Sequence, residues 1–474
     1  MFFWEFYFTI KAVLLDPAGI VQILDGLRAI DGLEKHGFLG AYLGTEPVVA
    51  FFREDSIRAL MTSAETNTSK GDQNAFLYPW LGRGVLIASG AHWRTHRRLL
   101  DPVFGSTKLQ HFVPLMSAQV QLMMQRIASL SPSQTIDVRL LMDDVSLDMI
   151  TATIMGASVG AQLETTNREE YIEPIKEATK LFVKRIMNPL HQNDLIYSLS
   201  AEGRKYASTV KQIHRFVKQV IDERKKEIQQ SNCSVGQQNQ DNNNFFTLLL
   251  RTHQQHPAEF TEEDIFGEVN TFMFAGHETT SSSCVAALLL IAGDSRVQEL
   301  LFRELEAVLK DCNSVGDITV EHLRRLQYLE MVIQEAMRLY SPIPLMVKKV
   351  QRDLVVNGYT VPAGCSALVC FTLLHNDPGV FSHPSPHAFY PERFSSESEL
   401  HRMPYAFMPF SVGPRSCIGK SFSLLEMKLV LAAIIRRYHL TAITRRDEMR
   451  LGFAAVLKVS SPVLIRFEDR QKKD

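Results

Sequence analysis

The sequence predicts a mainly α-helical protein with a smaller β part. From about 108 to 228, apolar residues recur at three- and four-residue spacing, which is the period of helices that pack on one side. A second helical pattern, from 262 to 292, is apolar on nearly every side, as in a helix buried at the centre of a domain. Short β-branched runs near both ends of the chain predict the strands.

The first hundred residues contain short elements. Residues 41–52 predict a β-hairpin with its turn at 44–47, and residues 55–63 predict a short helix. Residues 71–91 are glycine-containing and loop-like. A basic helix is predicted from 92 to 100.

Longer helices follow in the second half. The polar stretch 229–244 predicts a surface loop between helices. The helix over 262–292 has acidic residues in its first turn, where they complement the helix dipole. Further helices are expected at 294–312, at 320–340 and, last, at 421–438.

Between these last two helices the sequence predicts a hairpin and loop in place of helix. Asn357-Gly358 joins two β-branched runs and predicts a hairpin over 353–362. Residues 363–420 are rich in Pro, Gly and His and predict mostly loop, a length that is commonly functional. The tail, with VLKVSSPVLIRF, predicts strands.

Composition excludes several classes of protein. Of 474 residues, 45% are hydrophobic and 22% charged, which is enough apolar material for a large core. The net charge of −1 argues against a nucleic-acid binder held by bulk charge. Six cysteines without a CxxC pair predict neither a disulfide framework nor a zinc ribbon, and favour a reducing compartment.

The first 30 residues form a short apolar segment. Glu5, Lys11 and Asp16 interrupt it, so no run of about 20 apolar residues encodes a membrane-spanning helix. No small-residue cleavage site follows, which argues against a secretory signal. Two interpretations remain: an amphipathic first helix, or a surface-lying or truncated membrane anchor.

Cys417 stands in an unusual setting, FSVGPRSCIG. A buried structural thiol is the ordinary interpretation of a lone cysteine. Here Gly413 and Gly419 permit tight turns, Arg415 brings positive charge, and a helix starting near Ile418 directs its dipole toward the sulfur. Each of these features favours the thiolate, which is the form that binds metal.

The pattern from Phe410 through Arg415 and Cys417 to Gly419 resembles the haem-binding signature of the cytochrome P-450 monooxygenases at every fixed position. The resemblance implies the cytochrome P-450 fold, with a long central helix over haem. It also implies that Cys417 is the iron ligand, where a thiolate favours O–O cleavage. Phe410 and Arg415 would belong to the cofactor site.

The segment Ala275-Gly-His-Glu-Thr-Thr lies in the middle of the predicted central helix. Polar groups there are costly unless they are satisfied, and Gly276 would allow the helix to widen where a ligand approaches. The segment resembles the family's oxygen-activation motif, which implies that Thr279 binds dioxygen and water and that Glu278 passes protons. A zinc-protease HExxH motif fails because Ser281 stands at its fifth position.

Two further pairs match the family. Glu335 and Arg338 share one helix face; a surface pair is the ordinary interpretation, but the resemblance implies a buried structural network completed by Arg393. Trp93 and Arg97 otherwise suggest only a basic helix surface; the resemblance places them at a haem propionate. Lys348 lies where the family often has an arginine for the other propionate, and lysine lacks the bidentate fork.

The resemblance extends from about residue 40 to the C-terminus, so residues 31–474 are expected to form one catalytic domain. The stretches FLYPWLGRGVLIASGAHWRTHRRLLDPVF and EVNTFMFAGHETT are most similar to the animal fatty-acid-hydroxylating branch, family four. Many members have a glutamate, which can bond to haem, where this chain has Ala275. Non-covalent haem b is therefore expected, and the terminal-carbon selectivity of that branch does not carry over.

The expected function is a haem-thiolate monooxygenase acting on an apolar substrate, with fatty acids favoured over steroids and xenobiotics. Phe272, Phe274, Ala275 and the 76–90 loop would line part of its pocket. Two rivals remain: a haem-thiolate isomerase or dehydratase that needs no reductase, and a non-catalytic haem-binding protein.

The resemblance also implies partners and a location. Electrons would come from an NADPH-dependent cytochrome P-450 reductase, with cytochrome b5 as a second donor. Arg94, Arg98, Lys420 and Lys428 would supply positive charge for that partner. The expected location is the endoplasmic reticulum membrane, with the catalytic domain facing the cytosol.

Overall fold

The computed structural model describes residues 36–470 except 44–45, 64–65, 67, 131–134, 157–158, 164–167 and 233–244. The expectations for residues 1–30 and for most of the 229–244 loop therefore lie outside the described residues. Among the described residues, no helix is both long enough and apolar enough to cross a bilayer.

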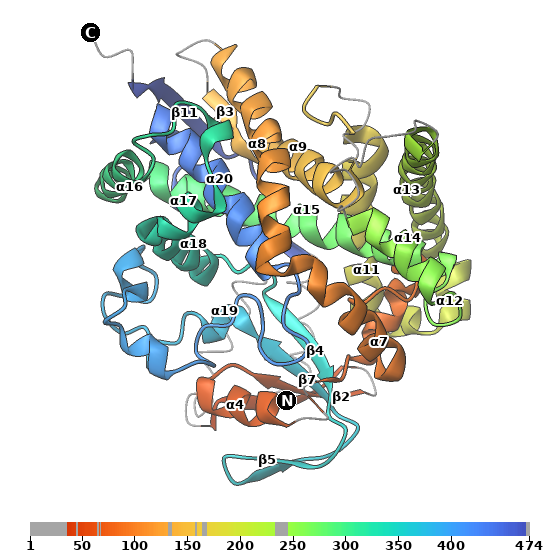
Figure 1. Ribbon diagram of the computed structural model, residues 1–474. Coiled ribbons are helices and arrows are strands. Elements are labelled where there is room, and N and C mark those ends of the chain that lie inside the picture. Colours follow the sequence, from red (N-terminus) through yellow and green to blue (C-terminus); the bar gives the residue numbers. More distant parts are fainter. Residues whose placement is uncertain are drawn as a thin grey trace.

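The described part is mainly helical, as expected (Figure 1). Its principal helices are α4 (Glu54–Thr62), α7 (Gly90–Leu100), α8 (Ser106–Ala128), α9 (Val138–Ile150), α11 (Glu173–Met187), α12 (Asp194–Leu199), α13 (Ala201–Asn232), α14 (Phe245–Gln255), α15 (Glu262–Ala292), α16 (Ser295–Val308), α17 (Val320–Arg325), α18 (Gln327–Leu339) and α20 (Lys420–Arg437).

Helix α15 runs through the middle of the molecule (Figure 1). It packs against α9, α18 and α20, and most of its side chains are buried, which confirms the expectation of a buried central helix. Its start is set by a reciprocal capping box between Thr261 and Asp264, and Gly293 follows its last residue. The predicted bounds of 262–292 are therefore correct.

The largest sheet lies beneath the helical part in Figure 1. A four-stranded sheet has the order β1 (Phe38–Leu43), β2 (Glu46–Phe51), β7 (Ser366–Cys370) and β4 (Leu345–Lys349), with β2 and β7 parallel and the other pairs antiparallel. The β1–β2 hairpin was expected. Its strand β2 pairs with β7, which lies more than 300 residues further along the chain.

The predicted turn at Asn357-Gly358 is confirmed. It joins β5 (Leu354–Val356) to β6 (Tyr359–Val361) in antiparallel pairing. Both turn residues have positive φ, 49° and 82°, which is the backbone of a two-residue type I′ hairpin turn. The tail forms β8 (Tyr438–Ala442), β9 (Leu451–Ala454), β10 (Val456–Val459) and β11 (Leu464–Asp469).

Two local expectations were wrong and one was incomplete. The stretch 363–420 is mostly loop, as expected, but it also contains β7 and the short helix α19 (Phe371–Leu374). Strand β7 is buried on both faces, so it shows no alternation of apolar and polar residues. The loop-like 71–91 segment contains a 3₁₀ turn and α6 (Tyr78–Leu81). The helical region before residue 228 is broken by β3 (Thr135–Asp137), which pairs with β11.

Candidate active site

The loop before α20 presents Cys417. The backbone N–H of Cys417 donates to the carbonyl of Phe410 at 2.9 Å, and that of Ser416 donates to Gly413 at 3.0 Å. Gly413 has φ +79°, a left-handed conformation that glycine adopts without strain. Gly419 has an ordinary φ of −87°, so the expected tight turn is needed at Gly413 and not at Gly419.

The Cys417 side chain is accessible, yet burial by the surrounding protein raises the pKa of its thiol. The thiol is therefore surrounded by protein but still borders space that solvent can reach. The backbone N–H of Gly419 and the charges of Arg97 and Lys420 act in the opposite direction and lower the pKa. A bound metal ion would hold the sulfur as the thiolate against this net shift.

The expectation for the Arg415 charge was wrong in one respect. Its guanidinium lies 3.9 Å above the ring of Trp93 and donates to the carbonyls of Thr68 and Ala88, at 3.0 and 2.6 Å. The charges that act on the Cys417 thiol are those of Arg97 and Lys420. Arg415 instead ties the Cys417 loop to the segment before α7.

Four cations lie near the contact between the Cys417 loop and the segment before α7: Lys70, Arg97, Lys348 and Arg415. Burial lowers the pKa of Lys348 to about 7, and the charges of Lys70 and Arg415 add to this. Burial and Arg415 lower the pKa of Lys70 to about 8. Burial and Arg97 lower the pKa of Arg415 to about 10. Like charges held together in a low-dielectric region favour an anionic group among them.

Arg97 connects this group to the cysteine loop. Its Nη1 donates to the carbonyl of Ser416 at 2.8 Å, and its Nε donates to Asp101 at 2.6 Å. Trp93, one turn earlier on α7, is buried. The structure therefore brings Trp93, Arg97, Lys348 and Arg415 to one region, as the sequence predicted. Lys70 was missed, because no motif distinguishes it from a surface lysine.

Helix α15 is buried on most sides, but Ala275 and Thr279 are partly accessible. They are four residues apart and share one face. The Thr279 hydroxyl donates to the carbonyl of Ala275 at 2.8 Å. The expectation for Gly276 was wrong: a Cβ there would lie 2.4 Å from Cδ1 of Ile150 on α9. The glycine permits close packing of these two helices, and α15 is a continuous α-helix through this position, so it does not widen there.

Glu278 is buried beside a cation that the sequence did not indicate. Its Oε1 accepts a 2.6 Å hydrogen bond from Nζ of Lys458 on β10, and its Oε2 has no hydrogen-bond partner. Burial disfavours the Lys458 ammonium, but the charges of Glu278 and Asp143 outweigh this and raise its pKa. These two residues are 180 positions apart, so no local pattern could have paired them.

The two phenylalanines expected to line the pocket are less exposed than Ala275. Phe272 packs against Phe104 and Phe245, with ring centroids 5.3 and 4.5 Å apart. Phe274 packs against Trp80 at 4.7 Å. Both phenylalanines are buried, whereas Ala275 is partly accessible.

Glu335, Arg338 and Arg393 meet in the interior. Arg338 donates twice to the Glu335 carboxylate, at 2.7 and 2.8 Å, and Nε of Arg393 lies 3.4 Å from Glu335 Oε1. Arg338 also donates to the carbonyl of His375, and Arg393 to that of Pro384. The network thus joins α18 to the long segment that leads to Cys417.

For one of the basic residues expected at the partner surface, the expectation was wrong. Lys428 is 3% exposed and its Nζ lies 2.7 Å from Glu330, so it is part of the interior. Arg94, Arg98 and Lys420 are exposed. They remain candidates for contact with an acidic partner.

The fold and site define a class: a mainly helical protein with an accessible cysteine thiol, a central helix carrying a threonine and an acid, and a group of buried and partly buried cations. These features fit haem, since the thiolate can bind iron and the cations suit the two propionates.

The comparisons with known proteins agree with this class. Residues 34–467 match the model of the family Cytochrome P-450, and the chain belongs to this family. It is 33% identical to cytochrome P-450 4V2 of Mus musculus over 439 residues, 91% of this chain and 82% of that protein. It is 33% identical to the Homo sapiens 4V2 protein over 465 residues, 97% and 87% of the two chains. Cytochrome P-450 4c21 of Blattella germanica is 30% identical over 438 residues, 90% and 85%.

Membership supports the expected class and branch. The chain is a cytochrome P-450 monooxygenase, a haem-dependent oxidoreductase that uses a small-molecule substrate and a redox partner, and its relatives are family-four members.

Proposed function

We propose that this chain hydroxylates fatty-acid-like substrates with electrons from an NADPH-dependent cytochrome P-450 reductase. The similarity to family-four proteins supports the substrate class. The observation that carries the chemistry is the accessible Cys417 thiol beside Arg97 and Lys420, at the start of α20.

When bound, haem supplies the activation of dioxygen, and the protein supplies binding, orientation and protons. Cys417 is the proposed iron ligand. The proposed contacts to the propionates come from Trp93, Arg97, Lys348 and Arg415. A haem dianion among these cations would restore the usual pKa values that burial and mutual repulsion lower at Lys348 and Arg415.

Phe410 has a proposed part in holding the cysteine. Its carbonyl accepts the Cys417 N–H, and its partly buried ring packs on the core. Ala275 has no carboxylate, so we propose that haem b is bound without a covalent link to α15. Glu335, Arg338 and Arg393 are proposed to brace the loop and not to react.

Thr279 and Glu278 are the proposed catalytic residues. The Thr279 hydroxyl donates to its own helix at 2.8 Å and keeps its oxygen lone pairs free to accept a hydrogen bond from water or substrate. Glu278 would have to loosen its ion pair with Lys458 to exchange a proton with Thr279. Its second oxygen, without a hydrogen-bond partner, is the one that can accept that proton.

The proposed location is the endoplasmic reticulum membrane with the catalytic domain toward the cytosol, and residues 1–30 as the membrane contact. Cytochrome b5 is a proposed second donor. Exposed Arg94, Arg98 and Lys420 suit a docking surface for an acidic redox partner.

The test begins with the carbon monoxide difference spectrum of the reduced protein. A strongly red-shifted Soret band is expected in the wild type and in Cys312→Ser, which alters a buried cysteine outside the loop, and is expected to be absent in Cys417→Ala. The band in Cys417→Ala, or no haem in any variant, would contradict the ligand assignment.

Turnover then tests the substrate class. With reductase and NADPH, saturated fatty acids of medium and long chain should give hydroxylated products that mass spectrometry detects. Product without an electron donor would favour the isomerase or dehydratase instead. Bound haem with no donor-dependent oxygen consumption would favour the non-catalytic protein.

A further inference from the structure

Two helices face each other with a set of metal-binding side chains. Helix α7 carries His92 and His96, and helix α15 carries Asp264 and Glu268. Each pair is four residues apart and so lies on one face of its helix. One ligand atom each from His92, His96 and Asp264 lies within 4.8 Å of the others.

His96 is oriented for a ligand. Its Nδ1 lies 2.7 Å from Glu268 Oε1, and the same carboxylate accepts the backbone N–H of Val85 at 2.9 Å. Because a carboxylate accepts, Nδ1 is the donor and Nε2 carries the lone pair. His96 is fully buried and its Nε2 has no hydrogen-bond partner. A buried, unpaired acceptor of this kind is costly unless it binds something.

The two carboxylate oxygens of Asp264 face different partners. Oδ2 accepts the backbone N–H of Thr261 at 2.8 Å and so caps α15. Oδ1 faces the histidines, 3.6 Å from His92 Nε2 and 3.7 Å from His96 Nε2. These two separations are too long for hydrogen bonds.

The same separations suit a metal ion. Tetrahedral zinc holds nitrogen and oxygen ligands at about 2.0–2.2 Å, which places ligand atoms about 3.3–3.6 Å apart. We propose that His92 Nε2, His96 Nε2 and Asp264 Oδ1 form a binding site for Zn²⁺, with water as the fourth ligand. Glu268 orients His96 from behind, as carboxylates do at many zinc sites.

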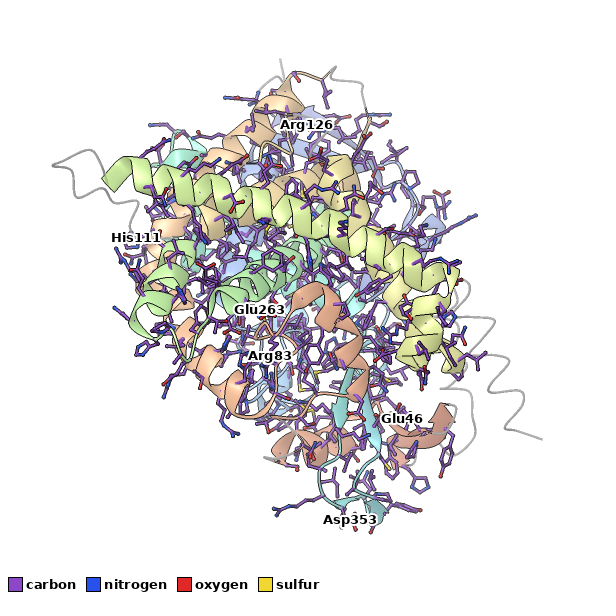
Figure 2. All side chains as sticks on the ribbon, turned by 90° about the vertical axis from the view of Figure 1, so that its right-hand side faces the viewer. Glu46, Arg83, His111, Arg126, Glu263 and Asp353 are labelled. Atoms are coloured by element: carbon purple, nitrogen blue, oxygen red, sulfur yellow. The ribbon has the colours of Figure 1, made fainter. Side chains whose placement is uncertain are left out.

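His92 requires two changes. Its Nε2 lies 3.1 Å from the carbonyl of Arg83 and points toward it. In the other neutral tautomer, the proton is on Nδ1 and Nε2 carries the lone pair, and a turn of the ring away from that carbonyl directs the lone pair toward zinc. Figure 2 labels Arg83, whose carbonyl faces His92, and Glu263, the neighbour of Asp264. Because the His92 side chain is partly exposed, zinc can reach the site from solvent.

Zinc bound at this site would link α7 and α15, two helices that both carry residues of the candidate active site. Helix α7 holds Trp93 and Arg97, and α15 holds Thr279. Zinc bound between them would stabilise the folded state by mass action and limit the motion of α7 relative to α15.

Zinc binding to the haem-loaded enzyme tests the proposal. Equilibrium dialysis with competition by a chromophoric chelator measures affinity and stoichiometry. We expect one zinc ion per chain, and a zinc K-edge absorption spectrum with nitrogen and oxygen ligands and no sulfur. Zinc should also raise the thermal unfolding midpoint.

Variants identify the ligands. His92→Ala and Asp264→Asn should weaken binding by about 100-fold or more, and Glu268→Gln by roughly 10–100-fold, as for the loss of an outer partner. His111→Ala and Glu263→Gln, both exposed residues (Figure 2), are matched controls and should bind as the wild type does.

Two results would overturn the proposal. One is the absence of stoichiometric zinc binding, which would leave the cluster as a structural arrangement of histidine and carboxylates. The other is zinc that binds equally well to His92→Ala, or that shows sulfur ligands, because either would place the ion elsewhere.

Discussion

Removal of the Glu335 carboxylate gives the sharpest test of how the cysteine loop is held. Glu335 and Arg338 are both 0% exposed, and Glu335 also accepts the backbone N–H of Tyr390 at 3.0 Å. In Glu335→Ala the Arg338 guanidinium stays buried without its counter-charge. Breaking a buried pair in this way costs about 3–5 kcal/mol, a large part of the stability of about 5–15 kcal/mol that is typical of a folded protein.

Denaturant unfolding followed by tryptophan fluorescence measures this loss, and the carbon monoxide difference spectrum reports on the thiolate. We expect Glu335→Ala to lower the free energy of unfolding by that amount and to lose most of the red-shifted band. Glu299→Ala is the control, because its i,i+4 pair with Arg303 is exposed and should contribute less than about 1 kcal/mol.

A double-mutant cycle makes the reasoning refutable. If the cost comes from an uncompensated charge, Glu335→Ala with Arg338→Met should cost less than the sum of the single changes, by about 2 kcal/mol or more. Additive losses, or a Glu335→Ala protein as stable as the wild type with an unchanged spectrum, would show that the buried pair does not hold the loop.

Three further predictions concern other contacts. Lys458→Met should lower the free energy of unfolding by about 3 kcal/mol and change the pH profile of turnover, because it leaves Glu278 buried without its cation; Lys458→Arg should preserve both. Gly276→Ala should cost about 1–3 kcal/mol by overpacking against Ile150, and Ile150→Ala in the same chain should recover part of it in denaturant unfolding. Burial raises the pKa of Glu426 to about 8. The unfolded chain loses that proton near pH 4.5 and the folded chain keeps it, so stability should fall as pH rises from about 4.5 to 8. Glu426→Gln should flatten that part of the stability curve, and an unchanged slope would count against a neutral buried carboxyl.

Local patterns in the chain were sufficient for several elements. The bounds of α15 follow from a capping residue and a following glycine, and the β5–β6 turn follows from Asn357-Gly358. The Cys417 turn is also local, because the carbonyl that accepts the Cys417 N–H is only seven residues earlier. In each case the interacting groups are close in sequence, so the residue types alone encode the geometry.

Strand β7 shows where such patterns fail. It is apolar from Ala367 onward and lies between β2 and β4, so no alternation of apolar and polar residues marks it. The direction of the Arg415 side chain was also unpredictable, because its aromatic and carbonyl partners are more than 300 residues earlier in the chain. Gly276 was predicted to make room for a ligand, because the sequence of α15 does not reveal that Ile150 of α9 packs against it.

The sequence by itself determined the family, the loop that presents Cys417, and the helix that carries Thr279 and Glu278. Only the tertiary structure decided which charges meet. Lys458 reaches Glu278, the Lys70 and Lys348 ammonium groups gather near Arg415, and Asp264 comes to lie against two histidines of α7. The physical reason is that a motif is read along one element, whereas the energy of a buried charge depends on every element packed around it.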